Sequence, residues 1–200
     1  MKSEIFSLFP TTFLKSRYFI DLSKELEYIK SIDYRSNETC LQSVDTFVLE
    51  AEVFKKLKNY IQLRLNEYCE KVLGTSTTLE ITQSWINVSA KNGQHKQHRH
   101  PNSVVSGVFY LYLESEMPQI TFANPNKNHY QFEANVITDQ CADEFTLNCE
   151  SGDLVLFSSS VDHYVPQNKI SKERISLSFN TFPKNAFGSK ENLTYCPLLT

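Results

Sequence analysis

The sequence contains no long apolar run and very little glycine, and both absences narrow what the chain can be. No stretch approaches the roughly 18 consecutive apolar residues of a membrane-spanning helix, and the N-terminus lacks the continuous apolar core of a secretory signal peptide. We therefore expect a cytoplasmic protein that does not associate with membranes. Glycine accounts for 5 of the 200 residues and no tract is repetitive, so we expect one domain over residues 1–200 without long flexible linkers.

Closely spaced cysteine pairs and an excess of basic residues are also missing. The 5 cysteines are widely spaced and form no CxxC pair, which disfavours a zinc knuckle and is typical of reduced thiols in the cytosol. The formal net charge is -3, so the sequence predicts no surface dedicated to nucleic-acid binding. Nucleic acid as a substrate stays open.

The composition is that of a globular protein, and the periodicity of the apolar residues changes once along the chain. Apolar residues make up 40% of the chain and aromatic residues 12%. Between residues 45 and 73, apolar side chains recur every three or four positions, which predicts an amphipathic helix capped by Asp45 or Thr46 and closed by Gly74. A shorter helix is expected over residues 22–32. The helical part of the domain therefore covers about residues 1–74.

From about residue 75 to residue 185 the pattern changes to short β-type runs separated by turn residues. We predict strands at Leu79–Val88, Val104–Leu113, Gln119–Phe122, Tyr130–Val136, Glu144–Cys149, Asp153–Phe157 and Ile175–Phe182. Helices followed by many short strands indicate an α+β fold, most simply a double-sheet jelly roll with the N-terminal helices packed on one sheet. The pattern alone does not separate this jelly roll from a sandwich or a barrel.

Three of the five histidines lie within six residues, in the segment HKQHRH. His98 and His100 are two apart, so on an extended chain both side chains point to one face, as two ligands of one metal require. His163 follows the apolar stretch GDLVLF, and a jelly roll can place a third ligand at the end of such a strand. Single histidines are more often surface or hydrogen-bonded residues, and this is what we expect of His95 and His129.

The order of several motifs resembles a known family. The motifs are SLFPTTF near the N-terminus, HxHPxS at the histidine pair, SGVxYL after it, GDLxxFxSxxxH ending at His163, and RxSxSFN starting at Arg174. Together they resemble the 2-oxoglutarate- and Fe(II)-dependent oxygenases found in bacteria and bacteriophages, over most of the chain after Gly74. This resemblance implies a double-stranded β-helix, a cupin-like form of jelly roll, with Fe(II) and 2-oxoglutarate as cofactors.

The resemblance also implies a set of metal ligands. His98 and His163 correspond to the proximal and distal histidine ligands, and His100 stands where the carboxylate of the usual two-histidine, one-carboxylate triad would be. Three neutral imidazoles leave the metal with more net positive charge, which retunes iron or favours zinc. Asn102 and Asp162 are the alternative oxygen ligands, although Asp162 should point away from His163 on an extended chain.

Four further residues are expected at the cofactor. By resemblance, Arg174 corresponds to the arginine that binds the distal carboxylate of 2-oxoglutarate, a task that suits a planar guanidinium. Ser176 shares its strand face and can add a hydrogen bond. Tyr110 and Tyr112 share one face of their strand and either face the cofactor or belong to the core.

Three other polar or aromatic residues are candidates for supporting the site. Trp85 and Asn87 share a face of the strand before the histidines and are candidates for the entrance of the site, and Asn180 is a candidate for orienting a neighbouring group.

The resemblance implies a dioxygenase that uses O2 to hydroxylate a substrate of unknown identity, with release of succinate and CO2. The alternatives are a cupin-like protein that binds zinc or manganese without oxygenase activity, and a catalytically inactive interaction domain. The exposed face of the long predicted helix leaves a homodimer possible.

Overall fold

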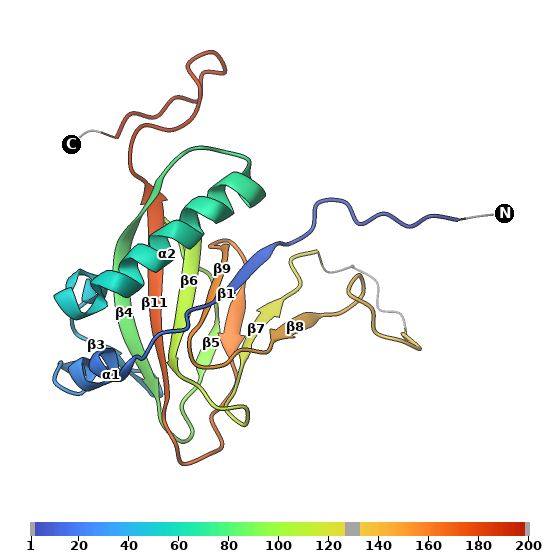
Figure 1. The fold of residues 1–200 in the computed structure, drawn as a ribbon. Helices are drawn as coiled ribbons and strands as arrows, with labels where there is room; N and C mark the ends of the chain where they lie inside the picture. The colour runs from blue at the N-terminus through green and yellow to red at the C-terminus, as the bar shows by residue number, and fades with distance from the viewer. Residues whose placement is uncertain (1–2, 127–132, 199–200) are drawn as a thin grey trace.

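Two antiparallel sheets form the centre of the computed structural model, which describes residues 3–126 and 133–198 (Figure 1). The larger sheet has seven strands in the order β1-β9-β6-β11-β4-β3-β2, and the smaller has four in the order β5-β10-β7-β8. The strands are β1 (Phe13–Arg17), β2 (Tyr34–Asn37), β3 (Cys40–Ser43), β4 (Leu79–Ser89), β5 (His95–His98), β6 (Val105–Tyr112), β7 (Ile120–Ala123), β8 (Glu144–Leu147), β9 (Asp153–Ser158), β10 (His163–Val165) and β11 (Arg174–Pro183).

The larger sheet has two buried faces of different character, as the two-residue alternation of β-strands requires. On β11, Leu177 and Phe179 face the helices and are fully buried in the main hydrophobic core. The alternate positions, among them Arg174 and Ser176, face the smaller sheet and line a cavity. One face therefore stabilises the fold by apolar burial, while the other carries polar groups between the two sheets.

The helices pack on one face of the larger sheet (Figure 1). They are α1 (Ser23–Ile29) and α2 (Lys55–Tyr68). The predicted single helix over residues 45–73 is wrong at its beginning: two 3-10 helices, η1 (Val48–Glu50) and η2 (Glu52–Phe54), precede α2, and a π-helical turn, η3 (Cys69–Leu73), follows it. Gly74 ends the helical segment at φ 64, as the sequence predicted.

Contacts with β4 explain why the helix starts late. The backbone N–H of Ser84 donates to the carbonyl of Thr46 at 2.8 Å, and the backbone N–H of Leu49 donates to the hydroxyl of Ser84 at 2.9 Å. These bonds hold residues 46–49 along the strand, so an apolar period that would suit a helix is overridden by tertiary hydrogen bonds. Asp45 still caps the backbone locally, because its carboxylate accepts from the N–H of Phe47 at 2.7 Å.

Most of the predicted strands are present, with ends shifted by at most two residues. The exception is the strand predicted at 130–136: residues 133–136 form no strand, and residues 130–132 lie outside the described part of the chain. The sequence did not predict β1, β2, β3, β5 and β10, which are three to five residues long. Such short segments carry too few alternating positions to be recognised, and their conformation depends on the neighbouring strand.

Two findings bear on the expectations drawn from absences. All five cysteines are free thiols, in agreement with the expected lack of disulfides. Within residues 3–126 and 133–198, no helix has the length and apolar character needed to cross a bilayer.

A glycine in the SGVxYL motif is required by packing, and its replacement is expected to destabilise the fold. A Cβ atom on Gly107 would lie 2.1 Å from the ring of Phe179, the directly opposite residue on β11. Because that ring is fully buried, it has little room to move. We expect Gly107→Ala to lower the free energy of unfolding by about 1–3 kcal/mol in urea titrations. The double variant with Phe179→Leu should recover part of this loss, and an unchanged midpoint in Gly107→Ala would contradict the packing argument.

Candidate metal centre

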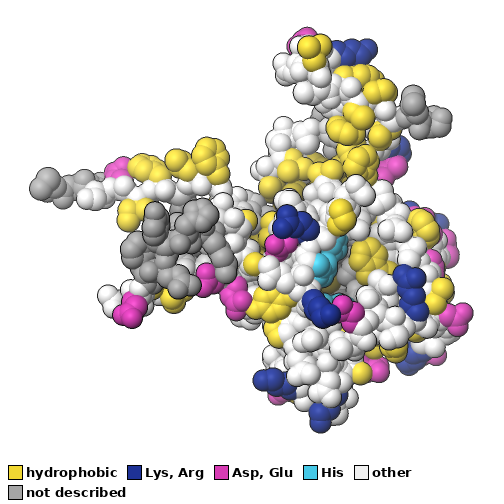
Figure 2. Space-filling view, turned by 180° about the vertical axis from the view of Figure 1, so that it is seen from behind, with side chains coloured by type: hydrophobic (Ala, Val, Ile, Leu, Met, Phe, Trp, Pro, Cys, Tyr) yellow, Lys and Arg dark blue, Asp and Glu magenta, His cyan; other side chains and the backbone are white. Residues whose placement is uncertain are grey.

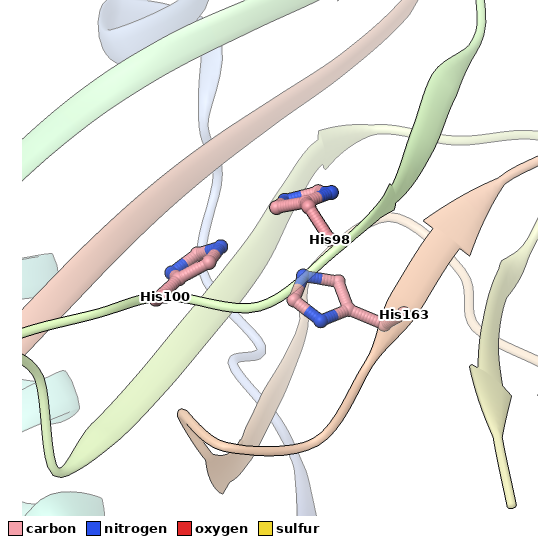
Figure 3. A group of neighbouring side chains, drawn as sticks. All are labelled: His98, His100 and His163. Atoms are coloured by element: carbon pink, nitrogen blue, oxygen red, sulfur yellow. The ribbon is translucent and has the colours of Figure 1, made fainter.

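Three histidines from two strands of the smaller sheet meet at one point (Figure 3). His98 is the last residue of β5, His100 lies two residues beyond it, and His163 begins β10 directly opposite His98. Their ring centroids are 4.4 to 5.2 Å apart, and one ring nitrogen of each lies within 4.8 Å of the others. The antiparallel pairing of β5 with β10 therefore joins residues that are 65 positions apart in the sequence (163 − 98).

Hydrogen bonds fix the orientation of all three rings. The Nδ1 atom of His98 donates to the carbonyl of Lys96 at 2.7 Å, and Nδ1 of His163 donates to the carbonyl of Val161 at 3.0 Å. The Nδ1 atom of His100 lies 2.5 Å from the side-chain oxygen of Asn180. Because a carbonyl oxygen can only accept, each Nδ1 carries a proton, and in the neutral form of each ring Nε2 is the nitrogen with the free lone pair. Hydrogen bonding of Nδ1 to an oxygen is the usual support for a histidine that binds a metal through Nε2.

Burial keeps two of these rings neutral. The exposed fraction of His163 is 5%, and burial lowers its pKa to about 3 despite the hydrogen bond to Val161. Burial also lowers the pKa of His100, and the hydrogen bond with Asn180 opposes the shift. A neutral imidazole is the form that binds metals, so both rings are in the ligand form at neutral pH.

A buried polar network supports His100. The hydroxyl of Ser106 lies 2.9 Å from Nδ1 of His100 and donates to the oxygen of Asn180 at 2.9 Å. Ser106 also bonds to Ser159 at 2.8 Å, and Ser159 donates to Ser103 at 2.8 Å. Asn180 belongs to β11, Ser106 belongs to β6, and Ser159 follows β9. The hydrogen-bond network that supports His100 therefore links three strands.

The histidines open into a cavity of about 480 Å³ between the two sheets. Figure 2 shows histidine side chains at the surface, with basic and acidic side chains beside them. Arg174, Ser176 and Asn180 of β11 line the same cavity, together with apolar side chains of β6, β7 and β9. A compact polar ligand near the histidines would therefore contact both the metal position and Arg174.

Arg174 is a buried guanidinium with an unusual set of partners. Its exposed fraction is 1%, its Nε donates to the carbonyl of Pro118 at 3.1 Å, and one terminal nitrogen donates to the hydroxyl of Ser176 at 3.3 Å. Its carbon lies 5.0 Å from the centroid of the Tyr110 ring. No carboxylate among the described residues forms an ion pair with it. A buried charge without a counter-ion is costly, so an anionic ligand suits this end of the cavity.

The two tyrosines expected at the cofactor lie beside the cavity, and neither lines it. Tyr110 is fully buried beneath Arg174, burial raises its pKa, and its hydroxyl has no hydrogen-bond partner within the described residues. Tyr112 is half-buried, and its hydroxyl donates to Glu114. Of the two, only Tyr110 contacts Arg174.

The remaining predicted residues fall into clear places. His95 is half-buried, bonded to Ser89 at 3.3 Å, and lines the cavity outside the metal cluster, while His129 lies outside the described residues. Asp162, an alternative ligand, is bound by Arg99 at 2.9 Å, and Asn102 occupies an exposed turn at φ 58. Neither belongs to the cluster of possible ligands among the described residues, which is made of three histidines.

Sequence reasoning missed one part of the cavity wall. Asn37, Glu38 and Gln42 of the β2–β3 hairpin line it, although they lie far from the other lining residues in the sequence. No motif marks them, because only the pairing of β3 with β4 brings the hairpin to the cavity.

The comparison with protein families covers the three histidines and Arg174. Residues 83–180 match the family model described as "Putative 2OG-Fe(II) oxygenase". The match covers 98 of the 200 residues of the chain. The matched segment runs from β4 to β11 and includes the three histidines and Arg174. This match agrees with the family resemblance read from the motifs, and the family is named for the two expected cofactors. No curated protein matches the sequence.

Solved structures confirm the fold. HygX from Streptomyces hygroscopicus, with nickel and 2-oxoglutarate bound, superposes with a TM-score of 0.64 at 12% identity, over 87% of this chain and 84% of that one. The epimerase SnoN from nogalamycin biosynthesis superposes with a TM-score of 0.61 at 12% identity, over 90% of this chain and 82% of that one. A Pseudomonas putida prolyl-4-hydroxylase superposes with a TM-score of 0.58 at 15% identity, over 88% of this chain and 94% of that one. The predicted α+β jelly roll is therefore correct. Since these proteins include an epimerase and a hydroxylase, the fold does not fix the reaction type.

Proposed function

We propose that the protein is a 2-oxoglutarate- and Fe(II)-dependent dioxygenase that hydroxylates a substrate with release of succinate and CO2. The orientation of the three histidines carries the proposal. His98, His100 and His163 each have Nδ1 bonded to an oxygen, so their Nε2 atoms are the metal ligands. Three protein ligands leave further coordination positions open, as binding of a co-substrate and O2 requires.

Arg174 is the residue that binds 2-oxoglutarate in this proposal. Its guanidinium has no acidic partner among the described residues, and the hydroxyl of Tyr110 beneath it is buried without a hydrogen bond. A carboxylate placed against Arg174 would pair with the guanidinium and accept from the Ser176 hydroxyl. These buried groups fit a dicarboxylic acid, since one end would meet the arginine and the other the histidines.

Chemically, bound iron with 2-oxoglutarate supplies the oxidation of an unactivated C–H bond by O2. The protein side chains position the reactants and exclude water. Val108, Ile120 and Phe157 line the cavity and are all at least nine-tenths buried. This apolar wall strengthens the electrostatic contact between Arg174 and a carboxylate, because it lowers the local dielectric.

Spectroscopy on metal-free protein tests the proposal. Anaerobic addition of Fe(II) and then 2-oxoglutarate should produce a visible metal-to-ligand charge-transfer band, and admission of O2 should then release succinate. Succinate added in place of 2-oxoglutarate should give no band. A folded protein that binds zinc or manganese with the same histidines but shows no band with Fe(II) and 2-oxoglutarate would instead be a cupin-like metal-binding protein.

The residue behind His100 should influence metal affinity without contacting the metal. Asn180→Ala removes the acceptor for Nδ1 of His100, so the ring loses its fixed orientation. We expect metal affinity to fall about 10- to 100-fold. Competition with a chromogenic chelator measures this affinity. Ser178→Ala is the matched control, because Ser178 lies two residues earlier on the same face of β11 and bonds to Asn87 instead. Equal affinities for both variants would show that Asn180 does not support the ligand.

A further inference from the structure

The two ends of the cavity differ in character. The inner end, around Arg174, is formed by the buried apolar side chains named above. At the outer end, Asn37 and Glu38 are exposed, and Gln42 and Trp85 are half-buried. A small dicarboxylic acid between Arg174 and the histidines would occupy the inner end. The outer end is therefore the part left for the substrate of the proposed oxygenase.

Strand register gives the cavity a polar floor that runs from Ser176 at the inner end toward the outer end. Ser176 of β11 lies opposite Asn87 of β4, and Asn87 lies opposite Gln42 of β3. Directly opposed residues of antiparallel strands share one face, so this row of one hydroxyl and two amides runs across three strands. Trp85 lies two residues before Asn87 on the same face and opposite Ser178. An indole and hydrogen-bonding groups thus lie side by side on the floor.

Two members of this floor are left available for a ligand. The exposed fraction of Asn87 is 6%, and its amide nitrogen donates to Ser178 at 3.1 Å. Nothing in the described part of the chain donates to its amide oxygen, although the residue lines the cavity. This amide oxygen, on a residue that lines the cavity, can accept a hydrogen bond from a ligand or water. Trp85 lies beside the metal position, with its ring centroid 6.1 Å from that of His100.

The charges around the opening compensate one another. Lys96 pairs with Glu38 at 2.9 Å, and Arg99 pairs with Asp162 at 2.9 Å. The lining of the outer end therefore offers paired cations only, which does not favour a phosphate-bearing ligand.

An extended peptide is disfavoured for a separate reason. The hydroxyl of Thr39 accepts from the N–H of Gln94 at 3.0 Å and donates to its carbonyl at 3.1 Å. The tip of the β2–β3 hairpin thereby occupies the backbone groups of Gln94, just before the edge strand β5, and so shortens the edge to which a peptide strand could add.

We propose that the outer end binds a neutral carbohydrate ring, with its apolar face on Trp85 and a ring hydroxyl donating to the amide oxygen of Asn87. The inference rests on the proposed function, because it names the substrate class of that site. A sugar ring combines a flat C–H surface with hydroxyls at its rim, and this matches one aromatic side chain beside a row of amides.

The single tryptophan of the chain is a built-in reporter of this site, because no other indole contributes to the emission. The experiment titrates neutral methyl glycosides, neutral nucleosides and capped neutral tripeptides into protein loaded with Zn(II) and 2-oxoglutarate, and records tryptophan fluorescence. We expect a saturable change with at least one glycoside and none with the other two classes. Saturation with nucleosides or peptides only, or with none of the probes, would overturn the proposal.

Substitutions locate the binding. In Asn87→Ala, we expect the affinity for the glycoside to fall about tenfold, since one hydrogen bond to a buried partner is lost. Gln83→Ala is the matched control, because Gln83 is an exposed residue of β4 outside the cavity lining. Unchanged affinity in Asn87→Ala would show that Asn87 does not bind the glycoside, and so would an equal loss of affinity in both variants.

The charge-transfer band with Fe(II) and 2-oxoglutarate distinguishes a failure of the proposed oxygenase function from a failure of the proposed substrate class. If the band forms in protein that binds no glycoside, only the substrate class is contradicted.

Discussion

Replacing His163 by alanine is expected to abolish tight metal binding while leaving the fold intact. Structural metal sites with about four ligands bind with roughly 10–16 kcal/mol, so one ligand contributes about 3 kcal/mol and its loss lowers affinity more than about 100-fold. His163 is also the ligand that joins β10 to the pair on β5, and the two remaining histidines are neighbours in sequence. Two ligands from one segment hold a metal weakly.

The result is measured by competition with a chromogenic chelator and by loss of the charge-transfer band. His95→Ala is the matched control, because His95 lines the same cavity, and burial lowers its pKa to about 4, yet its Nε2 bonds to Ser89. We expect this variant to bind metal as the parent protein does. If His163→Ala retained full affinity, or if both variants lost it equally, the three-histidine centre would be wrong.

The sequence could predict the pairing of His98 and His100 because this pairing depends only on neighbouring residues. Two histidines separated by one residue point the same way on any extended segment, whatever the rest of the chain does. The strands around it were also readable, since β6 and β9 are longer runs of apolar residues that are buried on both faces. The inclusion of His163 came from its place at the end of a jelly-roll strand and from the motif resemblance, because a cross-strand register cannot be read from either segment alone.

The residues that the sequence did not reveal depend on contacts between distant segments. Ser84 holds the chain at residues 46–49 and so shortens the helix, but nothing near Ser84 in the sequence marks this contact. Asn180 was expected only to orient some neighbouring group, and the structure gives it a specific partner in His100. The cavity wall formed by the β2–β3 hairpin was missed for the same reason. Local periodicity describes single elements, whereas these residues act through pairing.

The free-energy cost of burying the Arg174 charge indicates whether this residue serves ligand binding or folding. Burying an ionised group without a counter-ion costs several kcal/mol, and the hydrogen bonds to Pro118 and Ser176 return about 1–3 kcal/mol each at most. The arginine therefore does not stabilise the ligand-free protein. It becomes favourable when a carboxylate is bound, and so its presence is better explained by ligand binding than by folding.

Replacing Arg174 by methionine is expected to abolish 2-oxoglutarate binding without weakening the fold. A two-pronged contact between guanidinium and carboxylate contributes about 3 kcal/mol or more, so affinity should fall at least about 100-fold while metal affinity stays unchanged. In thermal melts without ligand, the variant should be as stable as the parent or more stable, because the unpaired charge is gone. Saturating 2-oxoglutarate should raise the Tm of the metal-loaded parent, because ligand at about 100 times Kd adds about 2.7 kcal/mol to the free energy of unfolding. It should leave the Tm of the variant unchanged.

Arg99→Met is the control, since Arg99 lines the same cavity but is exposed and paired with Asp162. A variant that keeps the ligand-induced shift, or a ligand-free variant that melts well below the parent, would mean that Arg174 serves the fold and binds no co-substrate.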